Sequence, residues 1–174
     1  MTTTTPRTTT PATAPPLDPT MAAIGEALAD ARQGNPAPAR TALRTLWTTI
    51  GATGDPLHRC TLAHHLADLY DDDPAQALAW DIRALDAADA LTQERLDRHH
   101  PGLRVAGFRP SLHLNLADNY RRLGSFEAAE DQITDARRHA PALPPDTYGD
   151  LLRTAIDQVA EAITRRDTTR RTPN

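Results

Sequence analysis

Residues 113–137, HLNLADNYRRLGSFEAAEDQITDAR, are the most informative stretch of this sequence. Apolar residues recur every three or four positions on both sides of the dipeptide Gly124-Ser125, a spacing typical of amphipathic helices. Two helices joined by so short a turn pack antiparallel. The small side chains of Ala117 and Ala129 let the two helices approach closely, and larger apolar residues fill the layers around them. The stretch therefore predicts a tightly packed helical hairpin.

The same helical periodicity extends over most of the chain after residue 20, for example in Leu62, Leu66, Leu69 and Tyr70. Three Asp-Pro pairs, at 18–19, 55–56 and 73–74, mark helix starts, because the carboxylate caps free N–H groups and proline suits the first helical position. We find no strand-like alternation of useful length. The predicted helices span 19–33, 36–50, 56–70, 74–90, 110–123, 126–139 and 146–165.

The hairpin at 113–137 resembles the tetratricopeptide repeat (TPR), a 34-residue unit with the pattern W-x₂-L-G-x₂-Y, then A-x₃-F, then P. Its positions are taken here by His113, Leu116, Ala117, Tyr120, Ala129, Ile133 and Pro141. His113 replaces the tryptophan, Ala117 the glycine and Ile133 the phenylalanine. A second copy covers residues 66–85, and a weaker one covers 27–46. The chain also resembles small repeat proteins of actinobacteria, since it has no lysine and abundant Ala, Arg, Asp and Thr.

The resemblance implies an all-α fold of antiparallel helical hairpins, stacked as a short, right-handed, TPR-like solenoid with a C-terminal capping helix. The hairpins fall at about 19–50, 56–90 and 110–139, and the cap at 146–165. The equivalent residues Leu66 and Leu116 lie 50 positions apart, 16 more than one repeat period, and the shorter turn of the second copy raises the excess to 18. We therefore predict an insert over residues 91–108.

Both ends of the chain have a different composition from the helical region. Residues 1–18 form a Thr/Pro-rich tail that cannot bury enough apolar surface to offset the entropy cost of ordering it. Residues 166–174 form an Arg-rich tail. We expect both to be disordered, which leaves one helical domain over residues 19–165.

Composition excludes several functional classes. The 19 basic residues are all arginine, so the P-loop lysine and a Schiff-base lysine are both missing. A single cysteine, Cys60, permits no internal disulfide and suits a reducing compartment, so we expect a cytoplasmic protein. No signal-peptide core or membrane-spanning stretch is recognisable. The net charge of -4 disfavours nucleic acid as a partner, apart from weak contact through the arginine-rich end.

The resemblance also implies a concave groove, lined by the first helix of each hairpin, that receives a peptide segment or a partner protein. Matching the groove spacing of the family onto this sequence gives His64, Asp68, Ser111, Asn115, Asp118, Arg121 and Arg122. Arg121 and Arg122 could offer bidentate donors to an anion, or lie solvated at a helix end. Asn115 could bind the backbone of a partner or a neighbouring helix. Asp68 and Asp118 would oppose an anionic ligand.

The leading hypothesis is therefore a non-catalytic protein-interaction module without a cofactor. One alternative is a receptor for a short peptide or small ligand, with residues 91–108 as a lid. A remote alternative is metal binding through Cys60 and His64, four residues apart on one helix face, with histidines such as His99 and His100 elsewhere. The two serines, Ser111 and Ser125, lie in no recognisable catalytic motif. Homodimerisation through a terminal repeat is compatible with each hypothesis.

Overall fold

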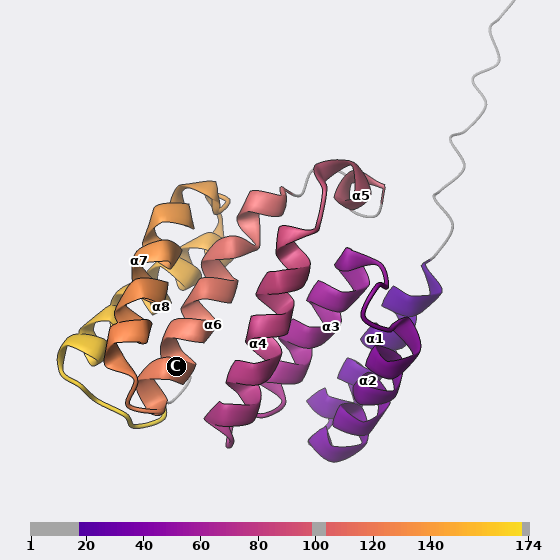
Figure 1. Cartoon of the computed structure of the whole chain (residues 1–174), viewed down its shortest axis with the longest axis horizontal. Helices are drawn as coiled ribbons and strands as arrows, with labels where there is room; N and C mark the ends of the chain where they lie inside the picture. Colours follow the sequence, from indigo (N-terminus) through magenta and orange to yellow (C-terminus); the bar gives the residue numbers. More distant parts are fainter. Residues whose placement is uncertain (1–17, 99–103, 172–174) are drawn as a thin grey trace, which may run out of the picture.

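A computed structural model describes residues 18–98 and 104–171, and every regular element within these ranges is a helix (Figure 1). The α-helices are α1 Pro19–Arg32, α2 Pro36–Ile50, α3 Pro56–Asp68, α4 Pro74–Asp89, α5 Gln93–Asp97, α6 Arg109–Arg122, α7 Phe126–His139 and α8 Thr147–Thr164. Two 3₁₀ turns, η1 Val105–Gly107 and η2 Ala140–Ala142, complete the structure. The prediction of an all-α fold is confirmed, and each end of the seven predicted helices agrees to within two residues.

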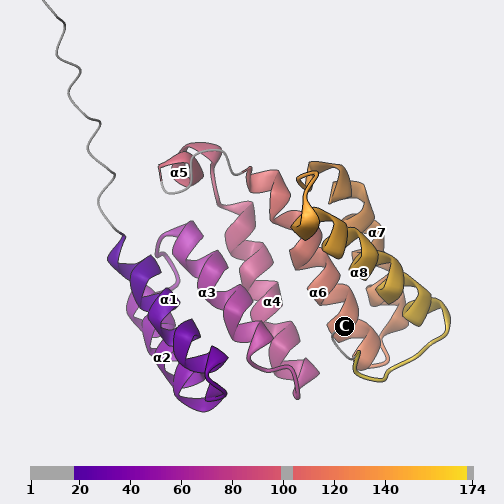
Figure 2. The same ribbon diagram turned by 180° about the vertical axis from the view of Figure 1, so that it is seen from behind.

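Consecutive helices pack as pairs, α1 with α2, α3 with α4, and α6 with α7. The pairs lie side by side in a row, from α1 and α2 at one end to α7 and α8 at the other (Figures 1 and 2). Helix α4 packs against α6 and so joins the second pair to the third. The last helix, α8, covers α6 and α7. None of the described helices is long and apolar enough to cross a membrane.

The predicted helix starts are confirmed at all three Asp-Pro pairs. Asp18 accepts hydrogen bonds from the backbone N–H groups of Thr20 and Met21 at the start of α1. Asp55 and Asp73 cap α3 and α4 in the same way. Each cap satisfies N–H groups that have no partner within the helix. The turn between α6 and α7 depends on Gly124, whose φ of 78° lies in the left-handed region that side chains disfavour.

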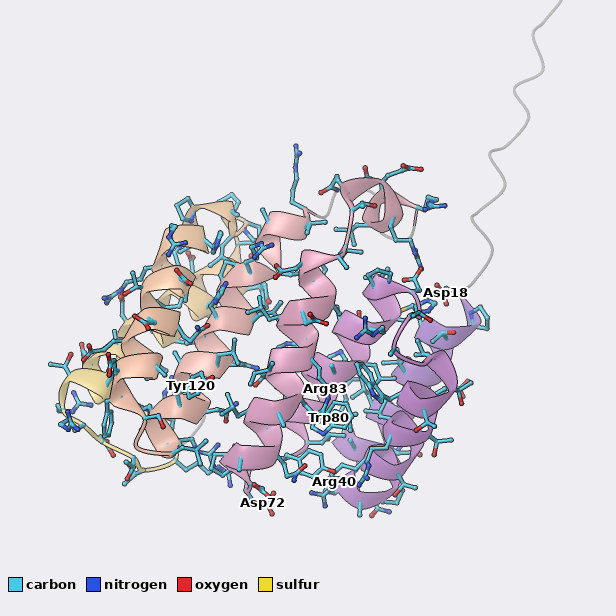
Figure 3. All side chains as sticks on the ribbon, in the orientation of Figure 1. Asp18, Arg40, Asp72, Trp80, Arg83 and Tyr120 are labelled. Atoms are coloured by element: carbon cyan, nitrogen blue, oxygen red, sulfur yellow. The ribbon has the colours of Figure 1, made fainter. Side chains whose placement is uncertain are left out.

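Small residues set the distance between the helices, as the sequence predicts. Ala117 and Ala129 are both completely buried where α6 meets α7. Around the first two pairs, a larger apolar core includes the ring of Trp80, which meets Trp47 edge to face with ring centroids 5.3 Å apart. The guanidinium of Arg83 lies 4.5 Å from the centroid of the Trp80 ring (Figure 3). Both tryptophans are therefore packing residues.

The insert predicted at residues 91–108 contains a short helix that the sequence analysis did not predict. Thr92 caps α5 by accepting a hydrogen bond from the N–H of Arg95. The backbone N–H of Val105 donates to the side-chain oxygen of Gln93 and so links the two described parts of the insert. Leu91 and Leu96 are buried against Leu57 at the start of α3. The described part of the insert is thus anchored to the domain. His99 and His100 lie outside the described residues, as do residues 1–17 of the predicted tail over residues 1–18. Asp18, the last residue of that tail, is the cap of α1.

The C-terminal segment differs from its prediction. We expected disorder from residue 166 onward, but residues 167–171 fold back toward α6 and bind it. The cause is Arg121, which donates hydrogen bonds to the carbonyl oxygens of Asp167 and Thr169. A polar segment that cannot bury apolar surface is held here by backbone hydrogen bonds to a buried cation. Residues 167–171 are therefore held against the helical domain, and residues 172–174 lie outside the described part.

Candidate binding cavity between α3, α4 and α6

A cavity of about 160 Å³ opens where the C-terminal ends of α3 and α6 meet the first half of α4. It is lined by Ala67, Asp68, Asp71, Ala77, Asp81, Asn115, Asp118, Asn119 and Arg122. The helices run roughly from top to bottom in Figure 3, where Asp72 labels the α3–α4 turn at the lower edge of the domain and Asp18 labels the start of α1 nearer the upper edge. The cavity lies at the Asp72 end. It brings together four of the seven predicted groove residues, Asp68, Asn115, Asp118 and Arg122.

Asp81 of α4 is the central polar residue of the cavity, with only 1% of its surface exposed. Its two carboxylate oxygens accept hydrogen bonds from α6, at 2.8 Å from the amide of Asn119 and at 3.4 Å from the amide of Asn115. Burial raises the pKa of Asp81 above its ordinary value, although the nearby His64 and Asn115 favour the charged form. A buried carboxylate with amide partners is thereby held at the floor of the cavity.

His64 approaches Asp81 from α3, with 3.8 Å between its Nδ1 atom and a carboxylate oxygen. Burial by itself lowers the pKa of a histidine, but the carboxylates of Asp81 and Asp68 outweigh it, so that the pKa of His64 is raised. His64 does not line the cavity. It instead interacts electrostatically with the buried carboxylate of Asp81 from helix α3.

Asn115 takes one of the two roles that the sequence left open, the contact with a neighbouring helix. Its amide donates to Asp81, which belongs to the neighbouring helix α4. The side chain is only partly buried and contributes to the cavity wall. Asn115 therefore links two helices and still presents polar atoms to the cavity.

The two adjacent arginines have different positions. Arg122 donates a hydrogen bond to the backbone carbonyl of Asp71 and has one nitrogen 3.7 Å from the Asp71 carboxylate, so it ties α6 to the α3–α4 turn. Arg121 is completely buried and binds Asp118 at 2.8 Å as well as the C-terminal segment. Both interpretations of Arg121, as a donor to a partner and as a solvated residue, are wrong. Its side chain is directed to the carbonyl groups of residues 167–171.

Ser111 is also absent from the cavity. Its hydroxyl donates to the carbonyl oxygen of Phe108 at 2.9 Å at the start of α6, about one helical turn before Asn115. Three polar lining residues, Asp71, Asp81 and Asn119, were not predicted. Asp71 and Asp81 lie outside the first helices of the hairpins, to which the prediction was restricted, and Asn119 lies on α6 but outside the groove spacing that was matched. One signal was present for Asp81, which interrupts the otherwise apolar face of α4 formed by Ala77, Ala84 and Ala88.

The lining of the cavity carries a surplus of negative charge. It contains four aspartates and one arginine, and Arg122 is already engaged by Asp71. Asp118 is paired with the buried Arg121, but Asp68 and Asp71 are about half exposed. An anionic ligand would meet these two accessible carboxylates, whereas a cationic group would find acceptors in them. The cavity is therefore suited to a positively charged side chain.

The metal-binding alternative gains no support from the placement of Cys60. The thiol is buried in the apolar core, and burial raises its pKa to about 12, which disfavours the thiolate that binds zinc. No group of three or more His, Cys, Asp or Glu side chains within residues 18–98 and 104–171 is placed to hold a metal ion.

Comparisons with protein-family models, with curated proteins and with solved structures found no match for this chain. The function is therefore argued from the geometry of the cavity.

Proposed function

We propose that this protein is a non-catalytic interaction module of TPR-like architecture that binds a segment of a partner protein in the cavity between α3, α4 and α6. The observation that carries the proposal is a wall of partly buried Asn115 and Asp118 and exposed Asp68 around a buried, hydrogen-bonded Asp81. Amide and carboxylate groups of this kind bind the backbone and the charged side chains of a peptide.

The arrangement of the helices supports the architectural part of the proposal. Helices pack with their sequence neighbours, and α8 covers α6 and α7 as a terminal cap does in a repeat protein. Stacked hairpins of this kind form a right-handed solenoid in the tetratricopeptide repeat family, and residues 113–141 carry the spacing of that repeat.

The non-catalytic part of the proposal is supported by the candidate nucleophiles. The Cys60 thiol is buried and has a raised pKa, and the Ser111 hydroxyl is bound to a backbone carbonyl. Neither group faces the cavity.

The alternative of a receptor with residues 91–108 as a lid is less well supported. The described parts of this insert lie at the N-terminal end of α3, where Arg95 pairs with Asp55, whereas the cavity lies at the C-terminal end of α3. Within the described residues, the insert does not cover the cavity.

Quantitative affinity capture from a bacterial lysate tests the proposal. The immobilised chain is compared with Asn115→Ala, which removes a polar group from the cavity wall, and with Gln33→Ala, which removes an exposed amide at the end of α1. We expect one stoichiometric partner to be retained by the wild type and by Gln33→Ala and to be lost by Asn115→Ala. Circular dichroism establishes that all three chains are folded. Equal capture by all three would contradict the proposed site.

A further inference from the structure

The C-terminal segment reaches the rim of the cavity. After α8 the chain turns back toward α6, as Figures 1 and 2 show from opposite sides. Asp167 closes the turn by accepting hydrogen bonds from the backbone N–H and the hydroxyl of Thr169, at 2.8 and 2.7 Å. Arg121 then fixes the segment through the carbonyl oxygens of Asp167 and Thr169. We call residues 167–171 the C-terminal strap.

The strap places two arginines on different partners. Arg170 forms an ion pair with the carboxylate of Asp71, which lines the cavity. Arg171 contacts the side-chain oxygen of Gln158 on α8, which does not line the cavity. One guanidinium of the chain is therefore bound by the acidic wall, and its neighbour in sequence is not.

The bond between Arg170 and Asp71 joins two side chains that are each about half exposed, at 55% and 48%. Exposed ion pairs of this kind contribute little stability, so a competing cation can replace Arg170 at small cost. Arg121, which is fully buried, is in contrast a permanent anchor for the start of the strap. The strap is thus built from one fixed part and one exchangeable part.

We propose that the strap is an intramolecular competitor for the cavity, and that the partner segment which replaces it binds through an arginine side chain. This inference rests on the proposed function and names the chemistry of the partner. Asp71 already holds the guanidinium of Arg170, and the exposed carboxylate of Asp68 lines the same cavity. The partly buried amide of Asn115 adds a further polar group to the wall. A planar guanidinium with five donors matches such a set of carboxylate and amide oxygens better than a single ammonium group.

Nuclear magnetic resonance titration of the full chain tests this inference. The probe is a capped peptide with the sequence of residues 167–171, DTTRR, and the matched control peptide has citrulline in place of both arginines, which keeps the shape and removes the charge. The side-chain amide signals of Asn115 and Asn119 report on the cavity. We expect the arginine peptide to shift these signals and the citrulline peptide to leave them unchanged.

Two variants separate competition from a general charge effect. Arg170→Gln removes the contact with Asp71 and should tighten binding of the arginine peptide by about threefold. Arg171→Gln removes the same charge from the same segment but leaves Asp71 occupied, so we expect wild-type affinity. Hydrogen exchange should accelerate at the strap in Arg170→Gln.

Three outcomes would overturn the inference: equal affinity in the two variants, equal binding of the citrulline peptide, or no shift of the Asn115 and Asn119 amides in Arg170→Gln. None of these bears on capture of a partner that depends on Asn115, so failure of the inference is distinguishable from failure of the proposed function.

Discussion

The two ends of α3 carry similar residues and use them differently. At the N-terminal end, the carboxylates of Asp18 and Asp55 meet the guanidinium of Arg95 and the imidazole of His58. At the C-terminal end, four aspartates face a cavity in which Arg122 is the one arginine of the lining. We call the first the closed end of α3 and the second its open end.

The closed end shows how charges are used to hold the fold. Arg95 lies 2.5 Å from Asp55 and 3.3 Å from Asp18, and His58 lies 2.7 Å from Asp18. Leu91 and Leu96 of the insert also pack against Leu57, two residues after Asp55. The carboxylates of the closed end are largely buried, with 16% and 29% of their side chains exposed, and their contacts with Arg95 hold the insert. At the open end Asp68 and Asp71 are about half exposed beside the cavity, so a partner can reach them.

The largest effect on stability is expected at Arg121, which is completely buried and binds Asp118 in the wall of the open end. Arg121→Ala leaves the carboxylate of Asp118 and the carbonyl groups of Asp167 and Thr169 without their donor. We expect a loss of about 3 kcal/mol in the free energy of unfolding, measured by urea denaturation, because a fully buried cation is removed from its acceptors.

The neighbouring change Arg122→Ala is the control for this prediction. The side chain of Arg122 is 10% exposed and binds Asp71, which is half exposed in the α3–α4 turn, so its loss should cost only about 1 kcal/mol. Equal losses of unfolding free energy in the two variants would show that burial of Arg121 has no special role. Arg121 would then contribute no more to the stability of the open end than Arg122, which lines the cavity.

The pair Arg121 and Arg122 also shows where sequence reasoning stops. Helix positions and starts follow from local signals, namely alanine spacing and Asp-Pro caps, and these were predicted to within two residues. Adjacent residues point about 100° apart around a helix. Which of the two arginines becomes buried depends on the path of residues 167–171, and nothing local in the sequence of α6 determines that path.

The candidate site was predicted in part for the same reason. Asn115 and Asp118 lie on the exposed side of α6, which its periodicity identifies, and both line the cavity. The partner of Asn115 is Asp81 on α4, and their contact depends on how two helices from different hairpins are rotated against each other. Such rotation is fixed by packing of the whole domain and has no signature in either helix alone.

At the closed end, two substitutions of Asp18 separate the contribution of helix capping to stability from the contribution of its charge. Asp18→Ala removes the cap of α1 and the contacts with His58 and Arg95, and should cost about 2 kcal/mol in urea denaturation at pH 7. Asp18→Asn keeps a capping oxygen and removes only the charge, so we expect about half that loss. Binding of a partner at the open end should be unchanged in both variants.

The pH dependence of Asp18→Asn gives an independent check. Burial opposes ionisation of Asp18, but hydrogen bonds from His58 and from the helix start lower its pKa to about 2. A carboxyl with a lowered pKa in the folded state contributes stability above its unfolded pKa and loses it as the pH falls toward the folded value. The wild type should therefore lose its advantage over Asp18→Asn between about pH 4 and pH 2. A constant difference over this range would show that the charge of Asp18 does not stabilise the closed end.

The smallest effect is expected from His64, which supports the buried carboxylate at the open end. Because the pKa of His64 is raised in the folded state, its protonated form contributes stability that is complete below the unfolded pKa and is lost as the pH rises through the folded value. His64→Asn should destabilise the chain by about 1 kcal/mol near pH 6 and by less near pH 8. Thermal denaturation at the two pH values measures the difference, with His65→Asn as the control at the neighbouring, more exposed histidine. If the loss were instead greater at pH 8, Asp81 would not be stabilised by a protonated His64, and the open end would hold its buried carboxylate through Asn115 and Asn119 alone.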